Sequence, residues 1–171
     1  MKILFVSSGN SKNMISSITF NQGESLKKQG ISVTYFTIKE RGVFGYLRSI
    51  QQIRKQLKEN KYDIVHAHYS FSAFAASIAG AKPLFVSLMG SDVKSKSYYR
   101  ILIKSFNWFF WSSIIVKSED MKASLGIKNV SVIPNGVDIN LFKPLNQKEC
   151  KKLLNWNPNK KQILFVANQK R

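Results

Sequence analysis

Four short polar segments carry the side chains in this sequence that could bind or transform a ligand. Each of them follows or ends an apolar run that is typical of a buried strand. They are Ser8-Gly9-Asn10, His68, Gly90-Ser91-Asp92 and Asn135-Gly136 with Asp138. In parallel sheets, ligands bind beyond the carboxyl ends of the strands. We therefore expect these segments to line one site at one edge of a sheet.

Ser8-Gly9-Asn10 is a candidate phosphate loop, with Gly9 and Asn10 as its ligand-binding residues. Glycine lets a backbone amide approach a pyrophosphate, and the helix expected next would present its positive N-terminal end. The complete dinucleotide fingerprint contains three glycines, whereas this loop contains one. An ordinary strand-to-helix turn is therefore the alternative interpretation.

Two histidines, His66 and His68, are separated by one residue on the strand predicted at 63–68. We expect their side chains to point to opposite faces of the sheet, so that they do not form a metal-binding pair. His68 ends the strand and is a candidate catalytic residue, because it could bind a substrate hydroxyl or transfer a proton. A structural cap is the alternative for His68, and His66 is expected to pack beneath a helix.

Gly90, Ser91 and Asp92 place a flexible backbone, a hydroxyl and a carboxylate beside the predicted crevice. Gly90 and Ser91 are candidate ligand-binding residues. Asp92 is a candidate catalytic residue that could bind a sugar hydroxyl or receive a proton. The alternative is that Asp92 caps the following helix, because aspartate is a favoured N-cap.

Strands and helices alternate along the chain, which predicts an α/β fold with a mostly parallel sheet. The predicted strands cover residues 2–7, 31–38, 63–68, 83–88, 113–116, 130–133 and 162–167. The predicted helices cover residues 13–29, 46–60, 72–79, 98–111 and 149–154. This alternation places every polar segment named above at the carboxyl end of a strand.

The 171-residue chain is strongly basic, with a formal net charge of +18. Hydrophobic residues make up 44% of it, which excludes an intrinsically disordered chain. One cysteine, Cys150, excludes a disulfide framework and a cysteine-based zinc cluster, and it favours a reducing, cytoplasmic compartment. No apolar run has the length of a signal-peptide core or of a membrane-spanning helix, so neither is expected.

The charge favours an anionic partner, and one helix face concentrates it. Arg48, Lys55 and Lys58 lie opposite the apolar side of the helix predicted at 46–60. They are candidate contacts with an anionic membrane surface, and a solvated face is the alternative. The aromatic residues are not interleaved with basic ones as in a base-stacking platform, so no nucleic acid is expected as a partner.

The helix predicted at 98–111 is apolar on almost every side. Its polar residues, Arg100, Lys104 and Asn107, form a narrow stripe at helical spacing. A helix of this kind either contacts lipid or another domain, or is enclosed in a core. The sequence pattern leaves both open.

An internal echo suggests a domain boundary near the end of the chain. The run Ile3-Leu4-Phe5-Val6 recurs as Ile163-Leu164-Phe165-Val166, after a polar segment. We interpret residues 1–142 as one domain, 143–161 as a linker and 162–171 as the first strand of a second domain. A seventh strand added to the same sheet is the alternative.

Taken together, these residues resemble the N-terminal, acceptor-side domain of family 4 (group 1) glycosyltransferases. The opening strand Lys2-Ile3-Leu4-Phe5-Val6 with its glycine-containing loop is the first of four features that carry the likeness. Three motifs follow it in the family's order, and the last is the most specific. They are Asp63-Ile64-Val65-His66-Ala67-His68, Met89-Gly90-Ser91-Asp92 and Val132-Ile133-Pro134-Asn135-Gly136-Val137-Asp138. The resemblance implies half of a GT-B fold, which is a Rossmann-like parallel sheet with helices on both faces.

The resemblance also implies a reaction. It is the transfer of a sugar from a UDP- or GDP-sugar to a glycan or lipid-linked acceptor, with retention at the anomeric carbon. The family needs no metal and no other cofactor for it. Many members work at membrane surfaces, which implies polysaccharide or glycolipid synthesis for the cell envelope at the inner face of the membrane.

Some residue roles carry over from the family's motifs. Gly9 matches a loop glycine near the donor pyrophosphate, and His68 matches a strand-end histidine near the acceptor. Gly90 and Asp92 match the loop that faces the reacting sugar. Met89 stands where many members have histidine, so no histidine role is assigned at that position.

The same resemblance assigns the signature Asn135, Gly136 and Asp138 to the turn that leads into the interdomain hinge. It places the paired glutamates that grip the donor in a C-terminal domain, of which this sequence contains only the expected first strand. We therefore interpret the chain as a fragment that is inactive alone. The alternatives are a non-catalytic basic binding module for nucleic acid or an anionic surface, and a related GT-B epimerase or phosphorylase.

Overall fold

A computed structural model describes residues 1–9, 15–39, 42–93 and 97–164 of the chain. Six parallel strands form one sheet in the order β2-β1-β3-β4-β5-β6. The strands are β1 (Lys2–Ser8), β2 (Ser32–Ile38), β3 (Ile64–His68), β4 (Leu84–Ser87), β5 (Ser113–Val116) and β6 (Val130–Val132). The helices are α1 (Ser17–Lys28), α2 (Gly42–Glu59), α3 (Ser70–Ala79), α4 (Ser97–Phe109), α5 (Glu119–Leu125) and α6 (Gln147–Leu153).

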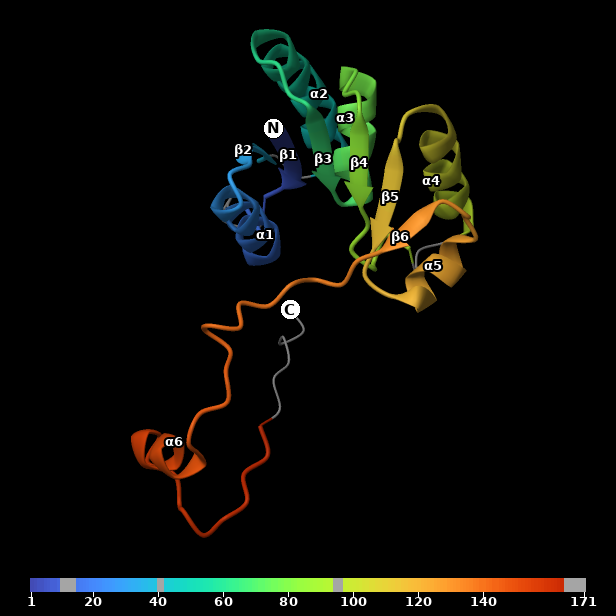
Figure 1. Cartoon of the computed structure of the whole chain (residues 1–171). Helices are drawn as coiled ribbons and strands as arrows, with labels where there is room; N and C mark the ends of the chain where they lie inside the picture. The colour runs from blue at the N-terminus through green and yellow to red at the C-terminus, as the bar shows by residue number, and fades with distance from the viewer. Residues whose placement is uncertain (10–14, 40–41, 94–96, 165–171) are drawn as a thin grey trace. The chain divides into compact units, whose positions relative to one another are not determined.

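The two faces of the sheet have separate cores. Leu4 and Val6 of β1 belong to the larger core, which α2, α3, α4 and α5 cover with apolar side chains. Ile3 and Phe5 point to the other face, where Val33 and the partly buried Leu26 of α1 pack against them. Alternation along β1 thus places helices on both faces, and the predicted Rossmann-like α/β fold is confirmed (Figure 1).

Short-range signals set several helix ends. The Ser16 hydroxyl accepts a hydrogen bond from the Thr19 N–H and caps α1, so this helix begins later than the sequence predicted. The predictions for α2, α3 and α4 correctly identified helices and missed their ends by a few residues. Gly80 ends α3 in the left-handed conformation, at a φ of 91°.

Helix α5 was missed by the sequence analysis. The Ser118 hydroxyl caps it by accepting from the Met121 N–H, and Gly126 ends it at a φ of 59°. Two acidic residues, Glu119 and Asp120, lie in its first turn, where the helix dipole favours negative charge. The sequence therefore contains a cap, an acidic first turn and a terminal glycine for this helix. A helix of two turns shows little periodicity, so the apolar pattern did not predict it.

The chain divides into two compact units, Met1–Gly136 and Val137–Arg171. The second unit contains α6, which Asn146 caps through the N–H groups of Lys148 and Glu149. Residues 162–164 were predicted to begin a strand but lie in irregular structure, and Ile163 is 97% exposed. No neighbouring strand pairs with them in the described ranges, and residues 165–167 lie outside those ranges. The linker at 143–161 and a second domain from 162 stay predictions.

No helix in the described part of the chain is long and apolar enough to cross a bilayer.

Ile53 tests the larger core, because it is fully buried on α2 whereas Leu47 on the same helix is 52% exposed. Truncating a buried isoleucine removes packed atoms and leaves a cavity, so we expect Ile53→Ala to lower the free energy of unfolding by about 2–5 kcal/mol. Leu47→Ala is the matched control and should change it by less than about 1 kcal/mol. Urea unfolding followed by circular dichroism measures both, and equal losses would contradict the assigned core.

Candidate functional site

Parallel pairing brings the carboxyl ends of all six strands to one edge of the sheet. The segments that follow β1, β3 and β4 lie next to one another there, since these strands are neighbours. β2 lies on one side of β1 and β3 on the other, so the strand order reverses at β1. The reversal point is where α/β sheets open a crevice for ligands. The predicted site therefore gathers Gly9, His68 and the loop 90–92.

A buried carboxylate organises the loop after β4. Asp92 is 1% exposed, and its carboxylate accepts hydrogen bonds from the N–H groups of Met89 at 3.0 Å and Gly90 at 2.9 Å. It also accepts from the Ser70 N–H at 3.3 Å, at the first residue of α3. Tyr69, the N-cap of α3, makes no side-chain capping bond, so Asp92 supplies that cap from another loop.

The described contacts bear on the second interpretation of Asp92, that of a helix cap. The helix that Asp92 caps is α3, whereas residues 94–96, which lead from Asp92 to α4, lie outside the described ranges. Burial raises the pKa of the Asp92 carboxyl, and the hydrogen bonds from Gly90, Met89 and Ser70 oppose that rise. The carboxylate holds two loops together, which favours a positioning role; direct contact with a reacting sugar stays a prediction.

Gly90 and Ser91 form the part of this loop that meets solvent. Gly90 has a φ of 108°, which side chains rarely tolerate, and apart from its chain neighbours no atom of the described residues lies within 4 Å of the position a Cβ would take. Ser91 is exposed. The open space beside Gly90 is consistent with a ligand approaching the backbone closely, as predicted for these two residues.

The prediction that His66 and His68 point to opposite faces is wrong. Their rings stack with centroids 4.3 Å apart, and both rings contact Phe5 from the same side. Side chains alternate along a strand with a period of two, so residues separated by one position share a face. The pair still has no third ligand, because no group of three or more His, Cys, Asp or Glu side chains gathers in the described ranges.

Both histidines are buried, and their environments differ. His66 Nε2 lies 2.9 Å from the Ser87 hydroxyl, whereas His68 Nε2 has no hydrogen-bond partner among the described residues. Burial lowers the pKa of His66 to about 4, and the Lys117 charge adds to this. Burial also lowers the pKa of His68 well below 6.5, and the charges of His66 and Lys117 add to this. His68 is 3% exposed, which favours packing; its contact with an acceptor stays a prediction.

Tyr69 is a candidate site residue that the sequence analysis missed. It follows β3 directly, with a φ of 80° that is rare for a bulky side chain. Burial and the Asp92 charge raise the pKa of its hydroxyl, and a hydrogen bond with Ser91 opposes the rise. A strained residue between the loop at Gly90 and the reversal point is typical of a functional site. Its position between a buried strand and a helix was the only signal in the sequence.

The other predicted residues have different positions. The Gly9 N–H donates to the Ile38 carbonyl at 2.9 Å, so that amide is already used within the fold. Asn10 lies outside the described residues. Asn135 and Gly136 leave the end of β6 and are exposed. Asp138 belongs to the second unit, where its carboxylate accepts from the Asn140 and Leu141 N–H groups.

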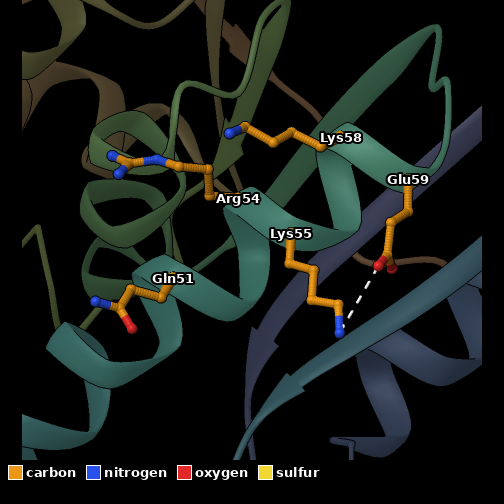
Figure 2. A pocket seen from close by; sticks show the side chains of 5 residues that line it. All are labelled: Gln51, Arg54, Lys55, Lys58 and Glu59. Carbon is orange, nitrogen blue, oxygen red and sulfur yellow. Dashed lines mark ion pairs between the residues drawn. The ribbon is translucent and has the colours of Figure 1, made fainter.

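The basic residues of α2 that were predicted as membrane contacts line two different hollows. Lys55 and Lys58 line one of about 300 Å³ with Gln51, Arg54 and Glu59 (Figure 2). There Lys55 Nζ lies 3.7 Å from Glu59 Oε1, and Arg54 Nη2 donates to the Ile78 carbonyl at 2.9 Å. Arg48 lines a second hollow of about 460 Å³ beside Lys39, at the carboxyl end of β2. Only the second hollow lies at the edge that carries the candidate site.

Asp92 makes a direct test of the loop that it holds. Asp92→Ala leaves three partly or fully buried N–H groups without an acceptor, so the free energy of unfolding should fall by about 2–4 kcal/mol. Asp138→Ala removes a similar set of bonds in an exposed turn and should cost less than about 1 kcal/mol. Denaturant unfolding of both variants checks this, and a harmless Asp92→Ala would show that the network contributes little.

The histidines predict acid sensitivity. A histidine in the unfolded chain has a pKa of 6.5. In the folded chain the pKa is about 4 for His66 and well below 6.5 for His68. The unfolded state therefore binds more protons in this window, and the free energy of unfolding should fall as the pH drops from about 7 towards 4. His68→Leu should reduce this fall and cost little at pH 7, because His68 Nε2 makes no hydrogen bond to any described residue.

His66→Leu is the comparison, because it also loses the bond to Ser87 and should be less stable already at pH 7. Urea unfolding at pH 7 and pH 5 separates the variants. The variant that combines His66→Leu with His68→Leu should lose less stability between pH 7 and pH 5 than the unchanged chain. Equal losses would show that these histidines do not cause the acid sensitivity.

No curated protein matches this chain by sequence. Three solved structures share its fold: sucrose-phosphate synthase from Thermosynechococcus elongatus (TM-score 0.74, 14% identity), HepE from Anabaena in complex with UDP and glucose (0.60, 19%), and MurG from Acinetobacter baumannii (0.53, 12%). The alignments cover 92%, 90% and 80% of this chain but 53%, 50% and 46% of those proteins, so the chain spans about half their length.

The shared fold is the N-terminal half of a GT-B fold, as the sequence predicted. The sequence profile of Glycosyltransferase Family 4 matches residues 15–141, which contain the strands and loops of the site except β1 and Gly9. The chain therefore belongs to Glycosyltransferase Family 4.

Proposed function

We propose that this chain is the acceptor-side half of an enzyme that transfers a sugar from a UDP- or GDP-sugar to a glycan or lipid-linked acceptor. The observation that carries the proposal is the family match over residues 15–141, on a parallel sheet whose polar loops meet at one edge. HepE, a protein of similar fold, was solved with UDP and glucose, which supports a nucleotide-sugar as the donor.

The proposed roles of the residues follow from the geometry. Gly90 and Ser91 present a backbone and a hydroxyl to the donor sugar, and Asp92 holds them in place. Tyr69 lies beside Ser91 and orients the reacting groups through its hydroxyl. Helix N-termini and basic side chains neutralise the charge that develops on the departing nucleoside diphosphate, in place of a metal ion. Transfer proceeds with retention at the anomeric carbon.

The donor site is proposed to need more than these residues. The chain spans about half the length of the three proteins of similar fold, which supports a second domain that holds the nucleotide. In this proposal the 171 residues alone transfer no sugar. The cellular setting that we propose is the cytoplasmic face of the membrane, in polysaccharide or glycolipid synthesis for the cell envelope.

The test begins with the reading frame downstream of the Arg171 codon, expressed together with this chain. Release of UDP or GDP from a panel of nucleotide-sugars, in the presence of oligosaccharide or lipid acceptors, measures transfer, and NMR of the product gives its anomeric configuration. Tyr69→Phe should lower kcat/KM by about tenfold with unchanged stability, because orientation of reacting groups is lost. Tyr62→Phe, before β3 and so at the other edge of the sheet, is the control: it loses the hydrogen bond that Gln56 Nε2 donates at 2.7 Å, and it should leave kcat/KM unchanged.

Three results would contradict the proposal. Binding of nucleic acid with a steep salt dependence and without sugar transfer would indicate a basic binding module. Interconversion of the donor sugar, or phosphorolysis of a glycan, would indicate a GT-B epimerase or phosphorylase. Turnover unaffected by Tyr69→Phe would remove Tyr69 from the site.

A further inference from the structure

Helix α4 is apolar on the side that faces the core and also on a side that faces solvent. Tyr99 and Ile103 point inward and are 8% and 0% exposed. At helical spacing around the other side lies a second apolar stripe, which we call the outer stripe of α4. Its members are Tyr98 (66% exposed), Ile101 (65%), Leu102 (40%), Trp108 (83%) and Phe109 (72%).

Packing within the described fold does not account for the outer stripe. Tyr99 and Ile103 already pack into the larger core, and no helix or strand described in the first unit covers the other side of α4 (Figure 1). Ser105 is the one polar side chain on this face of the helix. Five large apolar side chains gathered on one exposed face are costly to leave in water and mark an interaction surface. Two of them are aromatic side chains more than 70% exposed at the carboxyl end of the helix.

We propose that the outer stripe of α4 inserts into the interfacial region of an anionic lipid bilayer, with α4 lying in the membrane plane. This deepens the membrane attachment proposed above by naming the surface that makes it. An interfacial helix combines Trp, Phe and Leu on one side with Lys and Arg at its border and is too short to span. Trp and Tyr are favoured at the level of the head groups because their rings are amphipathic.

The charges beside the stripe favour lipid over a protein partner. Ser97–Phe109 contains no Asp or Glu, and the chain carries a net charge of +18. Arg100 and Lys104 border the apolar stripe along one side of the helix. Arg100 Nη1 donates to the Ser124 carbonyl, which holds this side of α4 against α5. Basic side chains at the rim of an apolar stripe match anionic head groups above acyl chains.

The basic face of α2 fits this role less well. Lys55 is paired with Glu59, and Lys55 and Lys58 line a hollow rather than border a continuous apolar stripe (Figure 2). Two large apolar side chains are exposed on α2, Phe44 (80%) and Leu47 (52%), against five on the outer stripe of α4, so α2 offers less apolar area to insert. The inference therefore concerns α4. It does not concern Arg48, Lys55 and Lys58, which are the membrane contacts predicted from the sequence.

Sedimentation of the chain with lipid vesicles tests the inference without any sugar transfer, so its failure is distinguishable from failure of the proposed reaction. Vesicles of phosphatidylcholine with phosphatidylglycerol should bind the chain, and pure phosphatidylcholine should bind it more weakly. Trp108→Ser with Phe109→Ser should weaken partitioning by about tenfold or more, because both rings lose their buried area. Lys104→Gln should weaken binding only to the anionic vesicles.

Phe142→Ser is the matched control, because Phe142 is about as exposed (70%) as Phe109 (72%) but lies in the second unit. Circular dichroism melts confirm that each variant folds. A second readout is quenching of tryptophan fluorescence by brominated lipids. Trp108→Phe should keep binding and lose most of the quenching, whereas Trp156→Phe should keep both.

The inference is overturned if the Trp108→Ser, Phe109→Ser chain binds anionic vesicles as well as the unchanged chain does. It is also overturned if binding is lost only when Arg48, Lys55 and Lys58 are all replaced by Gln. A chain that ignores vesicles and forms a dimer through the outer stripe, by light scattering, would show that a second copy covers α4 instead.

Discussion

The Asp92 carboxylate is the constraint on which the candidate site depends. It is buried, and it accepts hydrogen bonds from backbone N–H groups of two different loops, at Met89 and Gly90 and at Ser70. An ionised group is costly to bury unless hydrogen bonds compensate it, so both loops must keep the conformations that supply these donors. One side chain therefore sets the start of α3 and the shape of the loop after β4.

That constraint explains the strain beside it. Tyr69 lies between the end of β3 and the first residue of α3, and it takes a φ of 80°. The strand ladder fixes the residue before it and Asp92 fixes the residue after it, so the strained conformation is imposed from both sides. Gly90, at a φ of 108°, releases the corresponding strain in the neighbouring loop. The result is a rigid edge at the reversal point of the sheet, with Ser91 and the Tyr69 hydroxyl facing one another.

The apolar residues divide between two tasks in the same way. Most of them fill the two cores, and the alanines of α3 let this helix lie close to the sheet. The outer stripe of α4 does not take part in either core. This polar edge and this exposed apolar helix lie in one unit, and they are the features on which the function and the membrane contact that we propose depend.

The sequence by itself determined the α/β class, the order of the six strands along the chain and the polar segments at their ends. These follow from local patterns, because unbroken apolar runs and capping residues act over a few positions. It also carried the motifs that resemble the family. It determined less about α5, since a two-turn helix has little periodicity, and the face shared by His66 and His68 was misjudged although the period of two was available.

Only the tertiary structure decided what Asp92, Tyr69 and α4 do. Asp92 and Ser70 are separated by a helix and a strand, and only parallel pairing of β3 with β4 brings them within hydrogen-bonding distance. The pattern of α4 was apolar on almost every side, and packing against the sheet decided which apolar residues became core and which stayed in contact with solvent. Local sequence sets which conformations a segment prefers, whereas burial and long-range hydrogen bonds depend on what the fold places beside it.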